Sequence, residues 1–194
     1  MAQFKSLVPD VEVNGETVFS VIDGMGVFRT MAVQILTRNG IDDPKAGQWY
    51  SQQAWLDAFR VISETIGAVT LHAIGRKIPE NAQFPTNIDS VESALQSIDI
   101  AYHMNHRLQG KVMYDRHTKK MTEGIGHYYY EKLGENKAQM VCDNPYPCDF
   151  DQGIIEAMAR RFKPSGSLFV SVQHDDRVRC RKKGGDRCTY LIEW

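Results

Sequence analysis

The chain has 194 residues, of which 42% are hydrophobic, and its formal net charge is −1 at pH 7. This length is enough for one domain with a sizeable core. A net charge near zero, without a long lysine or arginine block, argues against a dedicated nucleic-acid surface. No apolar run approaches the roughly 20 residues of a membrane span, and the N-terminus lacks the apolar core of a signal peptide. We therefore expect a single cytoplasmic domain over residues 1–194 that binds neither membranes nor nucleic acids directly.

Helical spacing of apolar residues dominates the first half, about residues 1–109. Ser51 and either Asp89 or Ser90 are suited to cap two of the predicted helices. A shorter helix is predicted before Pro79, followed by a polar loop at 76–88. The predicted buried stripes are Phe28, Met31, Ala32, Ile35 and Leu36; then Trp55, Phe59, Ile62 and Ile66; then Val91, Ala94, Leu95, Ile98 and Tyr102.

The second half, about residues 110–194, changes to the period of two that is typical of strands. One helix interrupts it at 149–163, with Asp149 or Asp151 as the expected cap. Helices first, followed by a mostly antiparallel sheet with one further helix, is an α+β pattern. The predicted strands lie within 110–115, 126–133, 138–143, 167–174, 177–183 and 188–194.

All four cysteines lie in the last third of the chain. Gly184 and Gly185 predict a chain reversal that brings Cys180 and Cys188 together, and Cys148 stands at a helix N-terminus, where a thiolate is favoured. Three soft sulfur ligands in a reducing compartment suit a tetrahedral zinc ion. The alternative is that the three thiols pack as small apolar groups.

The segment "NPYPCDFDQGIIEAMARRF", followed by "CRKKGGDRCTYLIEW", resembles the 4-vinyl reductase domain family. The resemblance is best over residues 110–194. It implies an α+β fold related to small subunits of the TRAPP tethering complex, dimerisation through helices, and a cavity for a small apolar or aromatic molecule. It also implies a zinc ion held by three cysteines, at positions matching Cys148, Cys180 and Cys188, as in the ligand domain of phenol-sensing activators.

The fourth ligand in that family is a glutamate, which this chain lacks at the corresponding place. His174 suits zinc best there, while Asp175, Asp176 and Cys142 are alternatives. Four protein ligands leave no open position, so such a zinc would be structural.

Histidines and aromatic residues are the remaining candidates. His103 and His106 lie about one helical turn apart and are candidate ligands of a metal or a haem, although a solvated helix end explains them too. His127 is a candidate cavity residue that alternates with tyrosines on a strand. Phe28, Trp55 and Phe59 either line a ligand pocket between helices or belong to the core.

The main functional hypothesis is a stand-alone sensory domain. It would hold a small apolar or tetrapyrrole-like molecule, contain a structural zinc, form a homodimer and signal to a partner protein. The alternatives are a haem-binding sensor with a histidine axial ligand, an accessory factor or reductase in tetrapyrrole metabolism, and an interaction protein without a ligand. No nucleotide-binding fingerprint, HExxH or GxSxG motif is present, so an enzyme is not expected.

Overall fold

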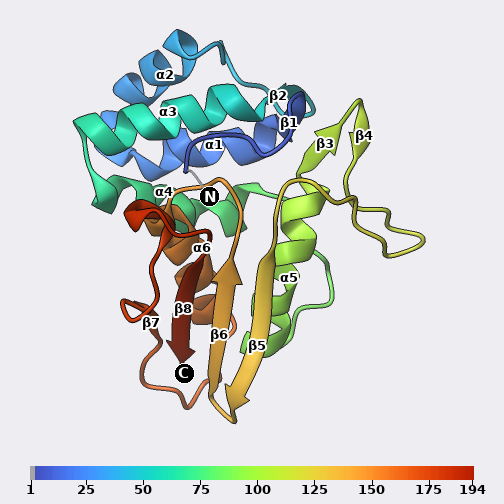
Figure 1. Cartoon of the computed structure of the whole chain (residues 1–194), viewed down its shortest axis with the longest axis vertical. Helices are drawn as coiled ribbons and strands as arrows, with labels where there is room; N and C mark the ends of the chain where they lie inside the picture. Colours follow the sequence, from blue (N-terminus) through green and yellow to red (C-terminus); the bar gives the residue numbers. More distant parts are fainter. Residues whose placement is uncertain (1–2) are drawn as a thin grey trace.

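The computed structural model describes residues 3–194 as a mixture of helices and two antiparallel sheets, which confirms the predicted α+β class (Figure 1). The helices are α1 (Gly15–Gly24), α2 (Arg29–Arg38), α3 (Gln52–Thr65), α4 (Ala68–Asn81), α5 (Val91–Met104) and α6 (Cys148–Arg161), with short 3-10 turns at Gly26–Phe28 and Arg181–Lys183. The strands are β1 (Val11–Asn14), β2 (Trp49–Ser51), β3 (His106–Leu108), β4 (Lys111–Val112), β5 (Tyr128–Gly134), β6 (Lys137–Cys142), β7 (Ser171–His174) and β8 (Cys188–Glu193).

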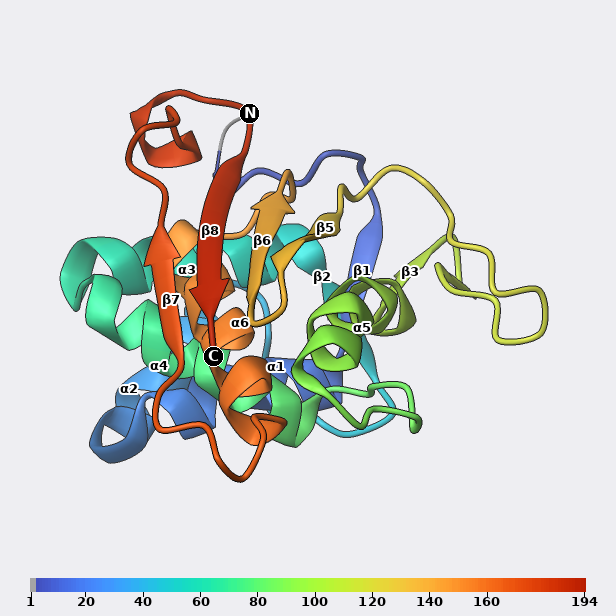
Figure 2. The same cartoon turned by 90° about the horizontal axis from the view of Figure 1, so that it is seen from below.

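The two sheets have the orders β2-β1-β3-β4 and β5-β6-β8-β7. The second sheet has the longer strands and is called the larger sheet below. Figure 1 shows α1, α2 and α3 gathered at one end of the molecule and the larger sheet at the other. Figure 2 shows α6 packed on the larger sheet, with α4 on its other side. The core is continuous through both ends, because buried residues of the helices and of the larger sheet belong to one cluster.

Helices α3 and α5 follow the predicted patterns. The Ser51 hydroxyl accepts a hydrogen bond from the Ala54 amide, and Ser90 forms a capping box with Ser93. The predicted stripe of α5 is buried throughout, and that of α3 is buried except at Ile66, which follows the helix and packs against the core. Local capping and periodicity therefore agree with the tertiary structure in these two segments.

Several local predictions are wrong. Helix α4 continues through Pro79 to Asn81, so the predicted loop starts later than residue 76. The strand expected at 177–183 is replaced by the turn Arg181–Lys183, because the Cys180 carbonyl accepts hydrogen bonds from the amides of both Lys183 and Gly185. The short strands β1 and β2 and the helix α1 were not predicted. Strands of three or four residues carry too little alternation to be recognised in a sequence.

Helices α4 and α6 approach each other backbone to backbone. A methyl group placed on Gly75 would overlap the carbonyl oxygen of Phe150, and one on Gly153 would overlap the carbonyl oxygen of His72. Only glycine fits at both positions, so the two helices meet without intervening side chains. This contact sets the distance between the helical end of the molecule and the larger sheet.

In residues 3–194, no single helix is long and apolar enough to cross a membrane. Helix α1 and the segment Gly26–Arg38 pass a test of length and composition only as a pair, and that pair is bent by 111°.

Candidate functional site

The residues predicted to hold zinc meet at one point of the larger sheet. Cys148 begins α6, His174 ends β7, Cys180 precedes the turn Arg181–Lys183, and Cys188 begins β8. One ligand atom from each residue lies within 4.8 Å of those of the other three. Four ligands around one zinc ion are roughly 3.3 to 3.9 Å apart, from Zn–S and Zn–N lengths at tetrahedral angles. The arrangement has the ligand types and compactness of a Cys3His metal site.

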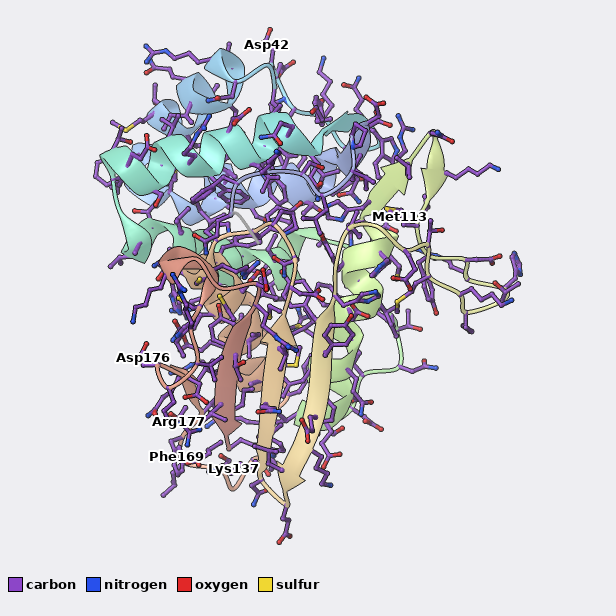
Figure 3. The ribbon with its side chains drawn as sticks, viewed as in Figure 1. Asp42, Met113, Lys137, Phe169, Asp176 and Arg177 are labelled. Atoms are coloured by element: carbon purple, nitrogen blue, oxygen red, sulfur yellow. The ribbon has the colours of Figure 1, made fainter. Side chains whose placement is uncertain are left out.

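His174 has one ring nitrogen without a partner, as expected of a histidine that binds a metal. Its Nδ1 lies 3.4 Å from Oδ1 of Asp176, whereas its Nε2 is buried and has no hydrogen-bond partner. A histidine that ligates a metal through one nitrogen usually donates from the other to a carboxylate or carbonyl. Figure 3 labels Asp176 and Arg177 at the outer edge of the sheet, on the loop after β7.

The alternative fourth ligands lie outside this group. Asp175 forms a two-point ion pair with Arg177, through Nε at 2.8 Å and Nη2 at 2.8 Å. Asp176 is a neighbour of His174 and lies outside the four-residue group. Cys142 is opposite Cys188 in the pairing of β6 with β8, but its buried thiol is not part of the group either.

The thiols of the group are free, and the surroundings of one of them favour the thiolate. Sγ of Cys148 lies 2.9 Å from Sγ of Cys188, and the Arg181 Nε donates to the same Cys188 sulfur at 3.3 Å. The hydrogen bond from Cys148 and the charge of Arg181 lower the pKa of Cys188 below its usual range. A lowered pKa favours the thiolate, which is the form that binds metal.

The aspartates beside Cys148 do not cap α6, contrary to the prediction. The N-cap residue is Pro147, and no side chain caps the helix. Asp149 instead pairs with Lys182. Asp151 points into the interior, where its carboxylate is fully buried. The opening turn of α6 thus contributes acidic groups to two separate ion pairs.

A buried ion pair between Asp151 and Arg181 lies directly beneath the cysteine group. Both side chains are inaccessible to solvent. The Tyr128 hydroxyl donates to Asp151 Oδ1 at 2.7 Å, and Arg181 Nη1 donates to the side-chain oxygen of Asn144 at 2.8 Å. The sequence does not predict this network, because Arg181 belongs to the basic run "RVRCRKKGGDR", and such runs usually form a solvated surface. The signal that could have found it is that Arg181 lies in the turn between Cys180 and Cys188, which belong to the same buried group.

A small apolar cavity lies between α5, α6 and the helical end of the molecule. Its free volume is about 40 Å³, which is room for roughly three water molecules. Trp55 and His106, two of the predicted ligand-binding residues, line it. The wall is completed by Thr17, Ile78, Ala82, Phe84, Ile98, Ala101, Tyr102, Asn105, Tyr128, Tyr146, Phe150 and Ile154.

The other three predicted ligand-binding residues do not line the cavity. Phe59 is buried behind it, with its ring centre 4.7 Å from that of Trp55. Phe28 is 50% exposed, because the turn Gly26–Phe28 carries it to the surface. His127 does not line the cavity, and its ring nitrogens contact Asp99 of α5 and Glu123.

His106 is the histidine of the cavity wall, and it is held neutral. Its Nδ1 lies 2.7 Å from the Tyr102 carbonyl oxygen and therefore carries the proton. Its Nε2 accepts a hydrogen bond from the Tyr146 hydroxyl at 2.7 Å. Burial lowers the pKa of His106 to about 3.

The free energy of unfolding is expected to decrease as the pH falls below about 6.5, the pKa of histidine in the unfolded chain. Below that pH the imidazole binds a proton in the unfolded chain, whereas in the folded chain it stays neutral down to about pH 3. His106 therefore contributes up to roughly 1.4 kcal/mol per pH unit to the dependence of the unfolding free energy on pH. Urea unfolding of the wild type and of His106→Gln between pH 4 and 7 measures this contribution. Groups common to both proteins cancel in the comparison, and equal slopes would contradict the prediction.

Solved structures of H-NOX proteins are similar in fold to this chain. An H-NOX protein from S. oneidensis matches with a TM-score of 0.61 and 14% identity, over 93% of this chain and 95% of that chain. An oxygen-binding H-NOX domain related to soluble guanylate cyclases matches with a TM-score of 0.60 and 18% identity, over 92% and 91%. An H-NOX mutant from T. Tengcongensis matches with a TM-score of 0.59 and 17% identity, over 93% and 96%. At these identities the likeness establishes the fold alone.

No protein-family model matches the chain, and no curated protein matches it. The resemblance to the 4-vinyl reductase domain and to small TRAPP subunits is wrong, because the matching solved structures are H-NOX domains. The hypotheses of a factor in tetrapyrrole metabolism and of a tethering-type interaction protein lose their basis with it. The resemblance rested on a cysteine pattern, and ligand spacing of that kind can occur on unrelated folds.

Proposed function

We propose that this protein is a ligand-sensing domain built on the H-NOX fold, which holds a small apolar molecule in the cavity beside His106. The observation that carries the proposal is the cavity itself, which is apolar and situated where the helical end meets α5 and α6. Ligand sites are concave and mostly apolar, with few polar groups that fix orientation. The polar groups here include the neutral His106 and the hydroxyl of Tyr146.

The size of the cavity defines the class of ligand. With about 40 Å³ of free space, it accommodates a molecule of a few non-hydrogen atoms, such as a diatomic gas, without movement of the wall. A ligand that binds one arrangement of the helices more tightly shifts the population toward that arrangement. The signal would then be read by a partner protein; that partner and a homodimer stay predictions.

Zinc has a structural role in this proposal. Cys148, His174, Cys180 and Cys188 would tie the start of α6 to β7 and β8 in a reducing compartment such as the cytoplasm. Four protein ligands leave no position for substrate. The ion would therefore stabilise the wall of the cavity through α6 and take no part in ligand binding.

The second candidate is a haem-binding sensor. One of the matched solved structures concerns the modulation of haem redox potential through protein-induced porphyrin distortion. His106 favours this candidate, because a proton on Nδ1 leaves Nε2 as the metal-binding nitrogen. His103 and His127 do not reach the cavity.

A haem does not fit the cavity, however. The free volume of about 40 Å³ is far below the roughly 300 to 1,000 Å³ of pockets for larger organic ligands. Among the described residues that line the cavity there is also no lysine or arginine to pair with the two haem carboxylates. Trp55, Tyr146 and Phe150 pack against one another across this space.

Xenon is the probe that tests the proposed ligand class, since it enters small apolar cavities. We expect one xenon site beside His106 in crystals of the wild type under xenon pressure, and none in Ala101→Leu, whose added atoms would fill the cavity. Ala46→Leu, in an exposed loop, is the control and should retain the site. A wild type without bound xenon would refute the proposed small-molecule site.

Haemin is the probe for the second candidate. Under our proposal, wild type mixed with haemin shows no sharp Soret band beyond that of free haemin. A stoichiometric band that is lost in His106→Ala, but kept in His72→Ala, would overturn the small-molecule proposal in favour of haem.

A further inference from the structure

A second group of potential metal ligands lies between α5 and the start of β5. Asp99 and His103 are four residues apart on α5, and His127 precedes β5. One ligand atom from each of these three residues lies within 4.8 Å of the other two. None of the three belongs to the cavity wall or to the Cys3His group.

His103 carries the first sign that something is bound here. Its side chain is fully buried, and its Nδ1 lies 2.9 Å from the carbonyl oxygen of Asp99. Its Nε2 is buried with no hydrogen-bond partner. A buried ring nitrogen without a partner destabilises the folded state. Across residues 3–194, the histidine nitrogens in this condition are Nε2 of His103 and Nε2 of His174, and the second belongs to the Cys3His group.

His127 is held by carboxylates on both sides. Its Nδ1 lies 3.0 Å from Asp99 Oδ2, and its Nε2 lies 2.9 Å from Glu123 Oε2. If a metal took the place between Nδ1 and Asp99, Glu123 would remain as the acceptor on the outer nitrogen. His103 would have the Asp99 carbonyl in the same role. Acceptors of this kind orient histidines that bind metals.

The separation of the two imidazoles agrees with a shared ion. The ring centres of His103 and His127 are 4.9 Å apart. Two imidazoles bound to one tetrahedral zinc have ring centres roughly 5 Å apart, given Zn–N lengths near 2 Å. An Asp–His hydrogen bond alone explains His127, but it leaves the buried nitrogen of His103 without a function.

We infer that Asp99, His103 and His127 bind a divalent transition-metal ion of the zinc type. Two imidazoles and one carboxylate suit zinc and its neighbours in the first transition row. Three protein ligands leave one coordination position open, in contrast to the closed Cys3His group. Glu123 is 80% exposed, so this second site borders the solvent and can exchange its ion.

Zinc itself is the probe, and the readout is the amount of metal bound per chain after dialysis against zinc and then buffer. We expect two equivalents in the wild type and one in His127→Ala. Asp99→Asn should also bind one; its amide oxygen can still accept from the Tyr128 amide, now 2.9 Å from Asp99 Oδ1, so the fold is kept. Cys188→Ser should lose the other equivalent, and the double variant Cys188→Ser/His127→Ala should bind none.

His117→Ala is the matched control, because His117 is exposed on a turn away from the group. It should retain two equivalents. Cobalt distinguishes the two sites by absorbance, since only cobalt bound to thiolates shows a sulfur charge-transfer band, and that band should persist in His127→Ala. A second equivalent that survives in both Asp99→Asn and His127→Ala, or a wild type that binds only the thiolate-held ion, would overturn the inference.

Discussion

Cys188→Ser is expected to remove the ion held by the Cys3His group and to lower the melting temperature by about 6 to 20 °C. A structural zinc contributes its binding free energy to folding, and a loss of ~3 to 5 kcal/mol corresponds to that range in a domain of this size. The effect is large because Cys188 has the lowered pKa that favours the thiolate and links β8 to α6 through Cys148. Elemental analysis and calorimetry measure the two quantities on the same sample.

Cys142→Ser is the matched control for this experiment. Cys142 is as buried as Cys188 and lies opposite it in the sheet, but it is outside the four-residue group. It should lose some stability because a hydroxyl is buried in its place, yet keep its zinc. If Cys188→Ser retains the wild-type metal content, the Cys3His site does not exist.

Arg181→Met is expected to destabilise the fold by ~3 to 5 kcal/mol, because it strands a buried carboxylate. Arg181 and Asp151 have no exposure to solvent, and burial already raises the pKa of Asp151 to about 7 despite the arginine. Methionine keeps most of the volume while removing the charge and its donors. Urea unfolding at constant zinc concentration gives the loss.

Arg177→Met is the control for the loss of an arginine. Arg177 makes a two-point contact with Asp175, but its side chain is 78% exposed, so the change should cost far less stability than Arg181→Met. The double variant Arg181→Met/Asp151→Leu should recover at least half of the loss, since no lone charge remains. A double variant less stable than Arg181→Met would show that the ion pair is not the source of the effect.

Much of the second half was predictable because its chemistry is local. The glycines between Cys180 and Cys188 predict the reversal, and Gly184 indeed adopts a left-handed conformation with φ of 77°. The antiparallel strands β5, β6 and β8 follow from alternation. His174 was named as the fourth ligand because it stands where the 4-vinyl reductase resemblance places a glutamate, and it lies beside the three cysteines although that resemblance is wrong.

The remainder depends on long-range packing that a sequence does not express locally. Phe28 has the spacing of a core residue, yet the turn at Gly26–Phe28 brings it to the surface. Arg181 belongs to a basic run that is typical of a solvated hairpin, but its guanidinium neutralises Asp151 inside the protein. The likeness to H-NOX domains is one of fold alone, at identities of 14% and 18%.

The contact between Gly75 and Gly153 limits how this protein can respond to a ligand. Each glycine leaves room for a backbone carbonyl of the other helix, so α4 and α6 are in direct backbone contact. Because Ile78 of α4 and Ile154 of α6 also line the cavity, a ligand that displaces one of these helices is expected to displace the other with it. A glycine-to-alanine change at either position would force the two helices apart and so disturb the cavity wall.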